Sequence, residues 1–202
     1  MSLYRTLIIL LFIAIVPLYS QKQPPIPPIK LDSYFERIKK LVDDESFPSL
    51  ENLLQKRAQS KGQERVDVCL DLFTHYIFKS TRTAKKYNDE AYELSRDLGY
   101  DGGYLRSSLN QAFVFFVRGE FDLAMDIIDR VETNDKCELY SDIEADGETL
   151  KSYIFTERCE YDLAYETALN LLETGEAQKN PYCMIMSYSA ISHFYLRLVE
   201  YD

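Results

Sequence analysis

Few residues in this chain have types and spacings suited to catalysis. Histidine is the usual general acid or base near neutral pH, and the only histidines are His75 and His193. Neither belongs to a recognisable protease motif, and the sequence contains no HExxH, no GxSxG and no phosphate-binding glycine loop. We therefore predict no catalytic residues, no enzymatic activity and a packing or binding role for both histidines.

The cysteines and acidic clusters could hold metals in principle. Cys69, Cys137, Cys159 and Cys183 match no zinc spacing, and no CxxC is present. They fit small buried apolar residues best, and a disulfide is the main alternative if the chain is exported. The acidic stretches 42–47 and 140–148 lack the ligand register and central glycine of a calcium loop. We predict neither a metal site nor a cofactor.

The clearest binding signal is aromatic. Phe113, Phe115 and Phe116 exceed what one buried helix face needs, and Arg106 precedes them on the same segment. Exposed aromatic side chains near an arginine are typical of surfaces that bind a peptide or a partner helix. The alternative, in which all three rings pack between neighbouring helices, fits the sequence equally well.

Composition limits the partners of such a surface. The 202 residues have 46% hydrophobic residues and a formal net charge of −10. Phosphate recognition needs clustered Lys and Arg, so the charge argues against nucleic-acid binding and against attachment to an anionic membrane. Few Gly and Pro residues favour helices over a turn-rich β fold. The expected partner is a protein or a peptide.

The N-terminal segments differ from the rest of the chain. Residues 1–20 have one early positive charge and a short apolar run, which is the layout of a secretory signal peptide. An uncleaved membrane anchor is the alternative. Residues 21–30 are a proline-rich, extended spacer. Residues 31–62 are two amphipathic helices that cap the array or form a divergent repeat. The prediction is an exported protein, periplasmic or secreted.

From residue 63 to residue 202 the pattern is helical throughout and repeats every 40 residues. Small residues recur where two antiparallel helices would cross closely, and aromatic or apolar residues recur beside them. One hairpin cannot bury its apolar face alone, so neighbouring hairpins must stack. The repeated columns are Ala84, Ala124 and Ala164; Phe121, Tyr161 and Tyr201; Ala91, Val131 and Leu171; Ala112, Ser152 and Ser192; and Phe115, Phe155 and Tyr195.

The order of small, aromatic, glycine, aromatic and alanine residues resembles the tetratricopeptide repeat (TPR), in a long variant with a period of 40 instead of 34. The resemblance covers about residues 65 to 202 and implies an all-α solenoid of stacked antiparallel helix hairpins. One copy reads Ala112, Phe115, Gly119, Phe121 and Ala124, and the next reads Ser152, Phe155, Cys159, Tyr161 and Ala164. Because Cys159 replaces the turn glycine, we expect a less left-handed turn there. We expect Gly175 to end the second helix of its hairpin.

In TPR proteins the first helix of each hairpin lines a concave groove, and the resemblance implies which residues face it here. We expect a partner to contact Arg106, Leu109, Phe113, Phe116, Val117, Tyr153, Thr156, His193 and Arg197, with Asp146, Thr149 and Glu157 in the same register.

Two functions remain open. The first is a non-catalytic exported TPR module that binds a protein or peptide in its groove. The second is the extracytoplasmic sensory region of a longer membrane signalling protein, a histidine kinase or helix-turn-helix regulator, which the resemblance to exported TPR regions of bacterial signalling chains suggests. The phrase "EYD" opens second helices at 120 and 160 and stands again at the C-terminus. On this ground we expect the last repeat to be truncated and membrane contact to come only from an anchor or a downstream segment.

Overall fold

The computed structural model describes residues 48–201, and all regular structure within this range is helical. The expected signal peptide, the spacer and the helix beginning near residue 31 lie outside the described residues. The helices are α3 (Leu50–Gln59), α4 (Gly62–Tyr76), α5 (Thr81–Leu98), α6 (Asp101–Val117), α7 (Phe121–Glu132), α8 (Ser141–Glu157), α9 (Tyr161–Gln178) and α10 (Pro181–Tyr201), with the 3-10 turn η1 (Cys137–Leu139) before α8.

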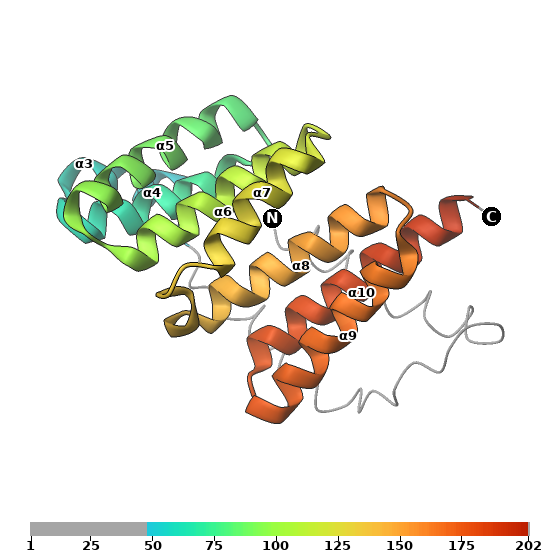
Figure 1. Cartoon of the computed structure of the whole chain (residues 1–202). Helices are drawn as coiled ribbons and strands as arrows, with labels where there is room; N and C mark the ends of the chain where they lie inside the picture. Colours follow the sequence, from blue (N-terminus) through green and yellow to red (C-terminus); the bar gives the residue numbers. More distant parts are fainter. Residues whose placement is uncertain (1–47, 202) are drawn as a thin grey trace. The chain divides into compact units, whose positions relative to one another are not determined.

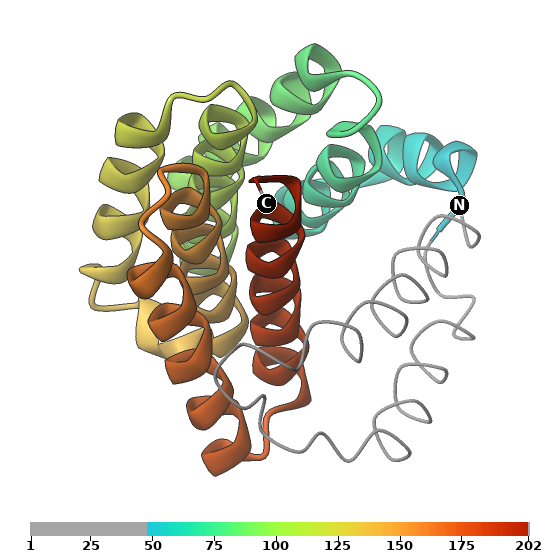
Figure 2. The same cartoon turned by 90° about the vertical axis from the view of Figure 1, so that its right-hand side faces the viewer.

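Successive helices pack as pairs, α4 with α5, α6 with α7 and α8 with α9, and α10 packs on both α8 and α9 (Figure 1). We call α4, α6, α8 and α10 the leading helices and α5, α7 and α9 the following helices. Each leading helix also contacts the next leading helix. Figure 2 shows α8, α9 and α10 side by side from a second direction. The all-α prediction is confirmed for the described residues.

The repeat columns lie where close packing requires them. Ala84, Ala124 and Ala164 are fully buried, and the hydroxyl of Ser152 donates a hydrogen bond to the Ala164 carbonyl at 2.8 Å. Ala112, Ala91, Val131 and Leu171 are buried as well, whereas Ser192 is only half-buried. The aromatic columns at Phe115, Phe155, Tyr195, Phe121 and Tyr161 are half-buried. The placement of the Tyr201 side chain lies outside the described residues.

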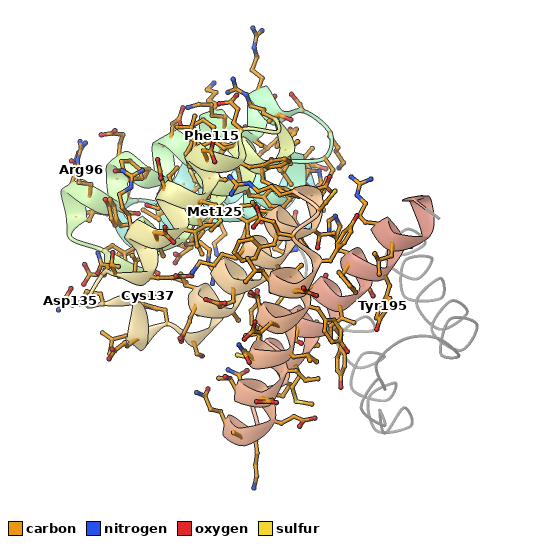
Figure 3. The ribbon with its side chains drawn as sticks, turned by 45° about the vertical axis from the view of Figure 1, so that its right-hand side comes forward. Arg96, Phe115, Met125, Asp135, Cys137 and Tyr195 are labelled. Carbon is orange, nitrogen blue, oxygen red and sulfur yellow. The ribbon has the colours of Figure 1, made fainter. Side chains whose placement is uncertain are left out.

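One apolar cluster joins α6, α7 and α8. Its buried members include Leu105, Ile128 and Ile154, and the half-buried Phe115 and Met125 pack against it (Figure 3). Ile128 and Ile154 are completely buried. This cluster holds two successive hairpins together, as expected if one hairpin cannot bury its apolar face alone.

The turn at Cys159 corrects the expectation from sequence. Cys159 has φ 61°, as left-handed as Gly119 with φ 75°. Both turns also make the same hydrogen bonds: Glu120 N–H donates to the Phe115 carbonyl and Glu160 N–H donates to the Phe155 carbonyl, each at 2.9 Å. This bond pattern defines the Schellman turn that ends many helices. The left-handed turn therefore forms at this position even though its residue is not glycine.

This geometry predicts that Cys159→Gly raises the free energy of unfolding by about 1 kcal/mol, because a residue with a Cβ is strained in the left-handed region. The matched change Gly119→Ala should lower it by a similar amount. Urea unfolding of both variants and the parent chain measures the two differences. Equal stability of parent and Cys159→Gly would show that the turn stores no strain.

Gly175 also departs from expectation, because it does not end its helix. It is buried inside α9, which continues to Gln178 and ends with Lys179 in the left-handed conformation at φ 53°. A Cβ on Gly175 would lie 2.9 Å from the backbone nitrogen of Met184. The glycine at this position allows α9 and the start of α10 to approach closely.

Candidate functional site

The expected partner-contacting residues bring four rings together across three leading helices. Phe113 and Phe116 of α6 have ring centroids 5.9 Å apart, and Phe116 lies 5.9 Å from Tyr153 of α8. Tyr153 lies 4.5 Å from His193 of α10. All four side chains are half-buried. We call Phe113, Phe116, Tyr153 and His193 the aromatic strip.

Two of the expected residues do not reach the surface. Leu109 is 5% exposed and Thr156 is 1% exposed. Thr156 donates its hydroxyl hydrogen bond to the Ser152 carbonyl one turn earlier, and Leu109 belongs to the apolar cluster of α6, α7 and α8. Their assignment as partner contacts is corrected, since both positions serve packing between helices. Thr149, in the same register, is buried too.

An arginine-centred ion cluster lies on the same helices, nearer the starts of α8 and α10. The Arg106 guanidinium contacts the carboxylates of Asp142 and Asp146, and the Tyr182 hydroxyl of α10 donates to Asp146 at 2.6 Å. Burial raises the pKa of Asp146, which Arg106 partly counteracts. Burial and the neighbouring Asp146 raise the pKa of Tyr182. The Arg106 guanidinium is therefore already paired within the chain, and it links α6 to α8.

A second ion pair lies on the other side of the strip, toward the C-terminal ends of α8 and α10. Arg197 of α10 donates to both carboxylate oxygens of Glu157 on α8, at 2.7 and 2.8 Å. His193 Nε2 lies 3.2 Å from the same carboxylate. Tyr153 is tied to α10 by a 2.7 Å hydrogen bond with the Ser189 hydroxyl, and burial raises the pKa of its phenol. These contacts fix the positions of two rings of the strip, those of Tyr153 and His193.

Sequence reasoning missed Phe78, which extends the strip. Phe78 stands in the turn after α4, is 85% exposed, and its ring centroid lies 6.0 Å from that of Phe113. Val117, which was expected at this surface, is 48% exposed. The sequence did offer an indication of an exposed ring, because Phe78 precedes the polar residues Lys79 and Ser80 in a turn and belongs to no buried helix face. Phe78 and Val117 form an exposed apolar end to the aromatic strip.

The groups considered for chemistry remain apart. His75 Nε2 lies 2.8 Å from Lys79 Nζ, and burial together with that cation lowers the His75 pKa. All four cysteines are free, and burial raises the pKa of the Cys69 thiol to about 11. Within residues 48–201 no group of three or more His, Cys, Asp or Glu side chains is placed to hold a metal ion. The clustered rings and ion pairs are suited to recognition.

No helix in the described part of the chain combines the length and apolar composition needed to cross a bilayer. Comparisons of the chain with protein-family models, curated protein sequences and solved structures return no match.

Proposed function

We propose that this chain is an exported, TPR-like α-solenoid that binds a protein or peptide segment on the face formed by its leading helices. The packing between helices supports a curved array in which this face is concave. Within residues 48–201 each leading helix contacts the next, whereas no comparable contact joins α5 with α7 or α7 with α9. An array whose leading helices lie closer together than its following helices curves with the leading helices on the inside. A bound segment would then cross α6, α8 and α10.

The observation that carries the proposal is the aromatic strip with its exposed end at Phe78 and Val117. Half-buried rings on rigid helices supply contact area at little cost in conformational entropy. The Arg106 and Glu157–Arg197 ion pairs stand on either side of the rings, as polar rims surround the centre of an interface. The strip therefore fits an extended or helical segment with apolar side chains at its centre.

The export part of the proposal rests on residues 1–20, whose composition is that of a signal peptide. The net charge of −10 separately disfavours nucleic-acid partners.

The binding surface is tested with peptides selected from a random display library on the full chain. Phe116→Ala is expected to weaken the selected peptides at least about tenfold, because a central ring is lost from the contact. Val117→Glu, a charge at an exposed position, should weaken binding similarly without touching the core. Calorimetric titration measures both affinities.

Leu123→Glu is the matched control, because Leu123 is 47% exposed on the following helix α7. It should leave the affinity unchanged. Circular dichroism and the Tm of each variant separate lost binding from lost folding. If Phe116→Ala and Val117→Glu are folded and bind as tightly as the parent chain, the surface is wrongly assigned.

A further inference from the structure

A cavity of about 400 Å³ opens between α5, α6 and α7, and the aromatic strip contributes nothing to it. This volume lies within the range of about 300–1,000 Å³ that small-molecule sites occupy. Leu105, Ile127 and Val131 form its apolar part, and the rings of Tyr92 and Tyr104, with centroids 5.0 Å apart, form an aromatic part. The polar lining residues are Asn88, Asp89, Glu93, Ser108, Gln111, Arg130 and Asn134.

One lining residue has an unused acceptor. Asn88 is 2% exposed, and its Nδ2 donates to the Ser107 carbonyl at 2.8 Å. Its Oδ1 is buried and receives no hydrogen bond. A buried acceptor left without a donor costs about 1–3 kcal/mol, and such groups in folded proteins call for an explanation. A ligand with an N–H or O–H donor would satisfy it once the side chains that cover Oδ1 move aside.

We call the packing of one hairpin's following helix against the next hairpin's leading helix a joint. The cavity lies at the joint of α5 with α6, and the next joint, of α7 with α8, is 40 residues later. Ile128 stands at the position of Asn88, and Gly147 at the position of Ser107. The two pairs meet in the same way, because a Cβ on Gly147 would lie 3.7 Å from Ile128 Cγ2. The joints α5–α6 and α7–α8 are therefore equivalent at this point.

At the second joint the 40-residue register places Lys151 where Gln111 lines the cavity. Lys151 Nζ contacts the carboxylates of Glu132 and Glu148 and lies 3.9 Å from Asp129. Forty residues earlier the corresponding positions are Gln111 for the lysine, and Tyr92, Ser108 and Asp89 for its three partners. The shorter, uncharged Gln111 supplies no ammonium. The cavity joint thus lacks the lysine and two of its three carboxylate partners, since Tyr92 stands for Glu132 and Ser108 for Glu148, and it keeps only the carboxylate of Asp89.

We propose that the cavity between α5, α6 and α7 binds a primary ammonium group in the place that Lys151 fills at the next joint. The rings of Tyr92 and Tyr104 attract a cation, and the Asp89 carboxylate and Asn88 Oδ1 accept its hydrogen bonds. Arg130 is the only cation among the lining residues, and its Nε donates to the Asp126 carbonyl of its own helix. Asp89 and Glu93 pair with Lys85 and Arg96 at the surface, so the ligand competes with exposed side chains only.

The ammonium group could belong to a small amine or to a lysine side chain of a partner protein. The experiment therefore titrates the full chain calorimetrically with n-butylammonium chloride, with N-acetyl-lysine methylamide and with n-butanol. We expect saturable binding of n-butylammonium and at least about tenfold weaker binding of n-butanol, which lacks the charge. Comparable binding of the lysine derivative assigns the site to a protein side chain, and its failure to bind assigns the site to a small amine.

Gln111→Lys is the decisive variant, because it places an ammonium where Lys151 places one. It should weaken n-butylammonium binding at least about tenfold. Gln63→Lys is the control, since it makes the same charge change at an exposed position of α4, and it should bind as the parent chain does. The proposal is overturned if the parent chain shows no saturable binding, if n-butanol binds equally, or if Gln111→Lys binds as tightly as Gln63→Lys.

Discussion

Replacing Gly103 by alanine is expected to lower the free energy of unfolding by about 2 kcal/mol, even though alanine favours a helix by about 1 kcal/mol over glycine. A Cβ at this position would lie 2.5 Å from Ser95 Oγ and 2.7 Å from both Val66 Cγ1 and Tyr100 Cδ1. Because these atoms belong to α4, to α5 and to the turn before α6, no single rotation relieves the overlap. Urea unfolding of the variant gives the loss directly.

Gly147→Ala is the matched control within a helix of the same array. The nearest atoms to its added Cβ would be Glu132 Oε1 at 3.4 Å and Ile128 Cγ2 at 3.7 Å, which is ordinary contact. Alanine should therefore leave stability unchanged or raise it by up to about 1 kcal/mol. If both glycine variants lose the same stability, the close approach of α4, α5 and α6 at Gly103 is not as the structure has it.

The second large effect is expected at Leu72. In the 40-residue frame Leu72 stands where the next two hairpins have Ala112 and Ser152, so the repeat pattern alone would favour alanine there. The structure predicts the opposite. Leu72 is completely buried and packs with Leu53 and Val68. Leu72→Ala should leave a cavity between α3 and α4 and cost about 3 kcal/mol, measured by urea unfolding.

Leu163→Ala makes the same chemical change at a position that is 47% exposed on α9. It should cost less than about 1 kcal/mol. A Leu72→Ala variant as stable as the parent would mean that α4 and α5 can close to the spacing of the later hairpins.

The helical architecture could be predicted from the helical spacing of the apolar residues. The small-residue columns could be predicted as well, because a close crossing of two helices tolerates only small side chains. That constraint shows at Ala124 and Ala164, where the same residue recurs. The same spacing holds in one further buried column. Ser107, Gly147 and Ser187 are 40 residues apart and completely or almost completely buried, and the Ser187 hydroxyl donates to the Ala168 carbonyl.

Other features could not be predicted because they depend on neighbours outside the local pattern. Cys159 takes a left-handed turn since both flanking helices fix its position, and no local preference of cysteine signals this. Gly175 resembles a helix terminator in sequence, but the close approach of α10 explains it. Leu109 and Thr156 have the helical spacing of the strip residues, and only the packing of α6 against α8 shows that they are buried.

The candidate surface could be predicted in outline. The clustering of Phe113, Phe116, Tyr153 and His193 follows from their register on leading helices, as expected. What the register could not show is that Arg106 and Arg197 already pair with Asp146 and Glu157 of the chain itself. Ion pairs between helices depend on which acid faces which base, and the period of 40 residues does not determine this.

The central claim, binding of a partner segment on the leading helices, is tested most directly by a crystal structure of the chain with a selected peptide. The account predicts a peptide lying across α6, α8 and α10, in contact with Phe113, Phe116 and Tyr153 and reaching Val117 or Phe78. A peptide bound on the outer faces of α7 and α9, with the aromatic strip left uncovered, would contradict it.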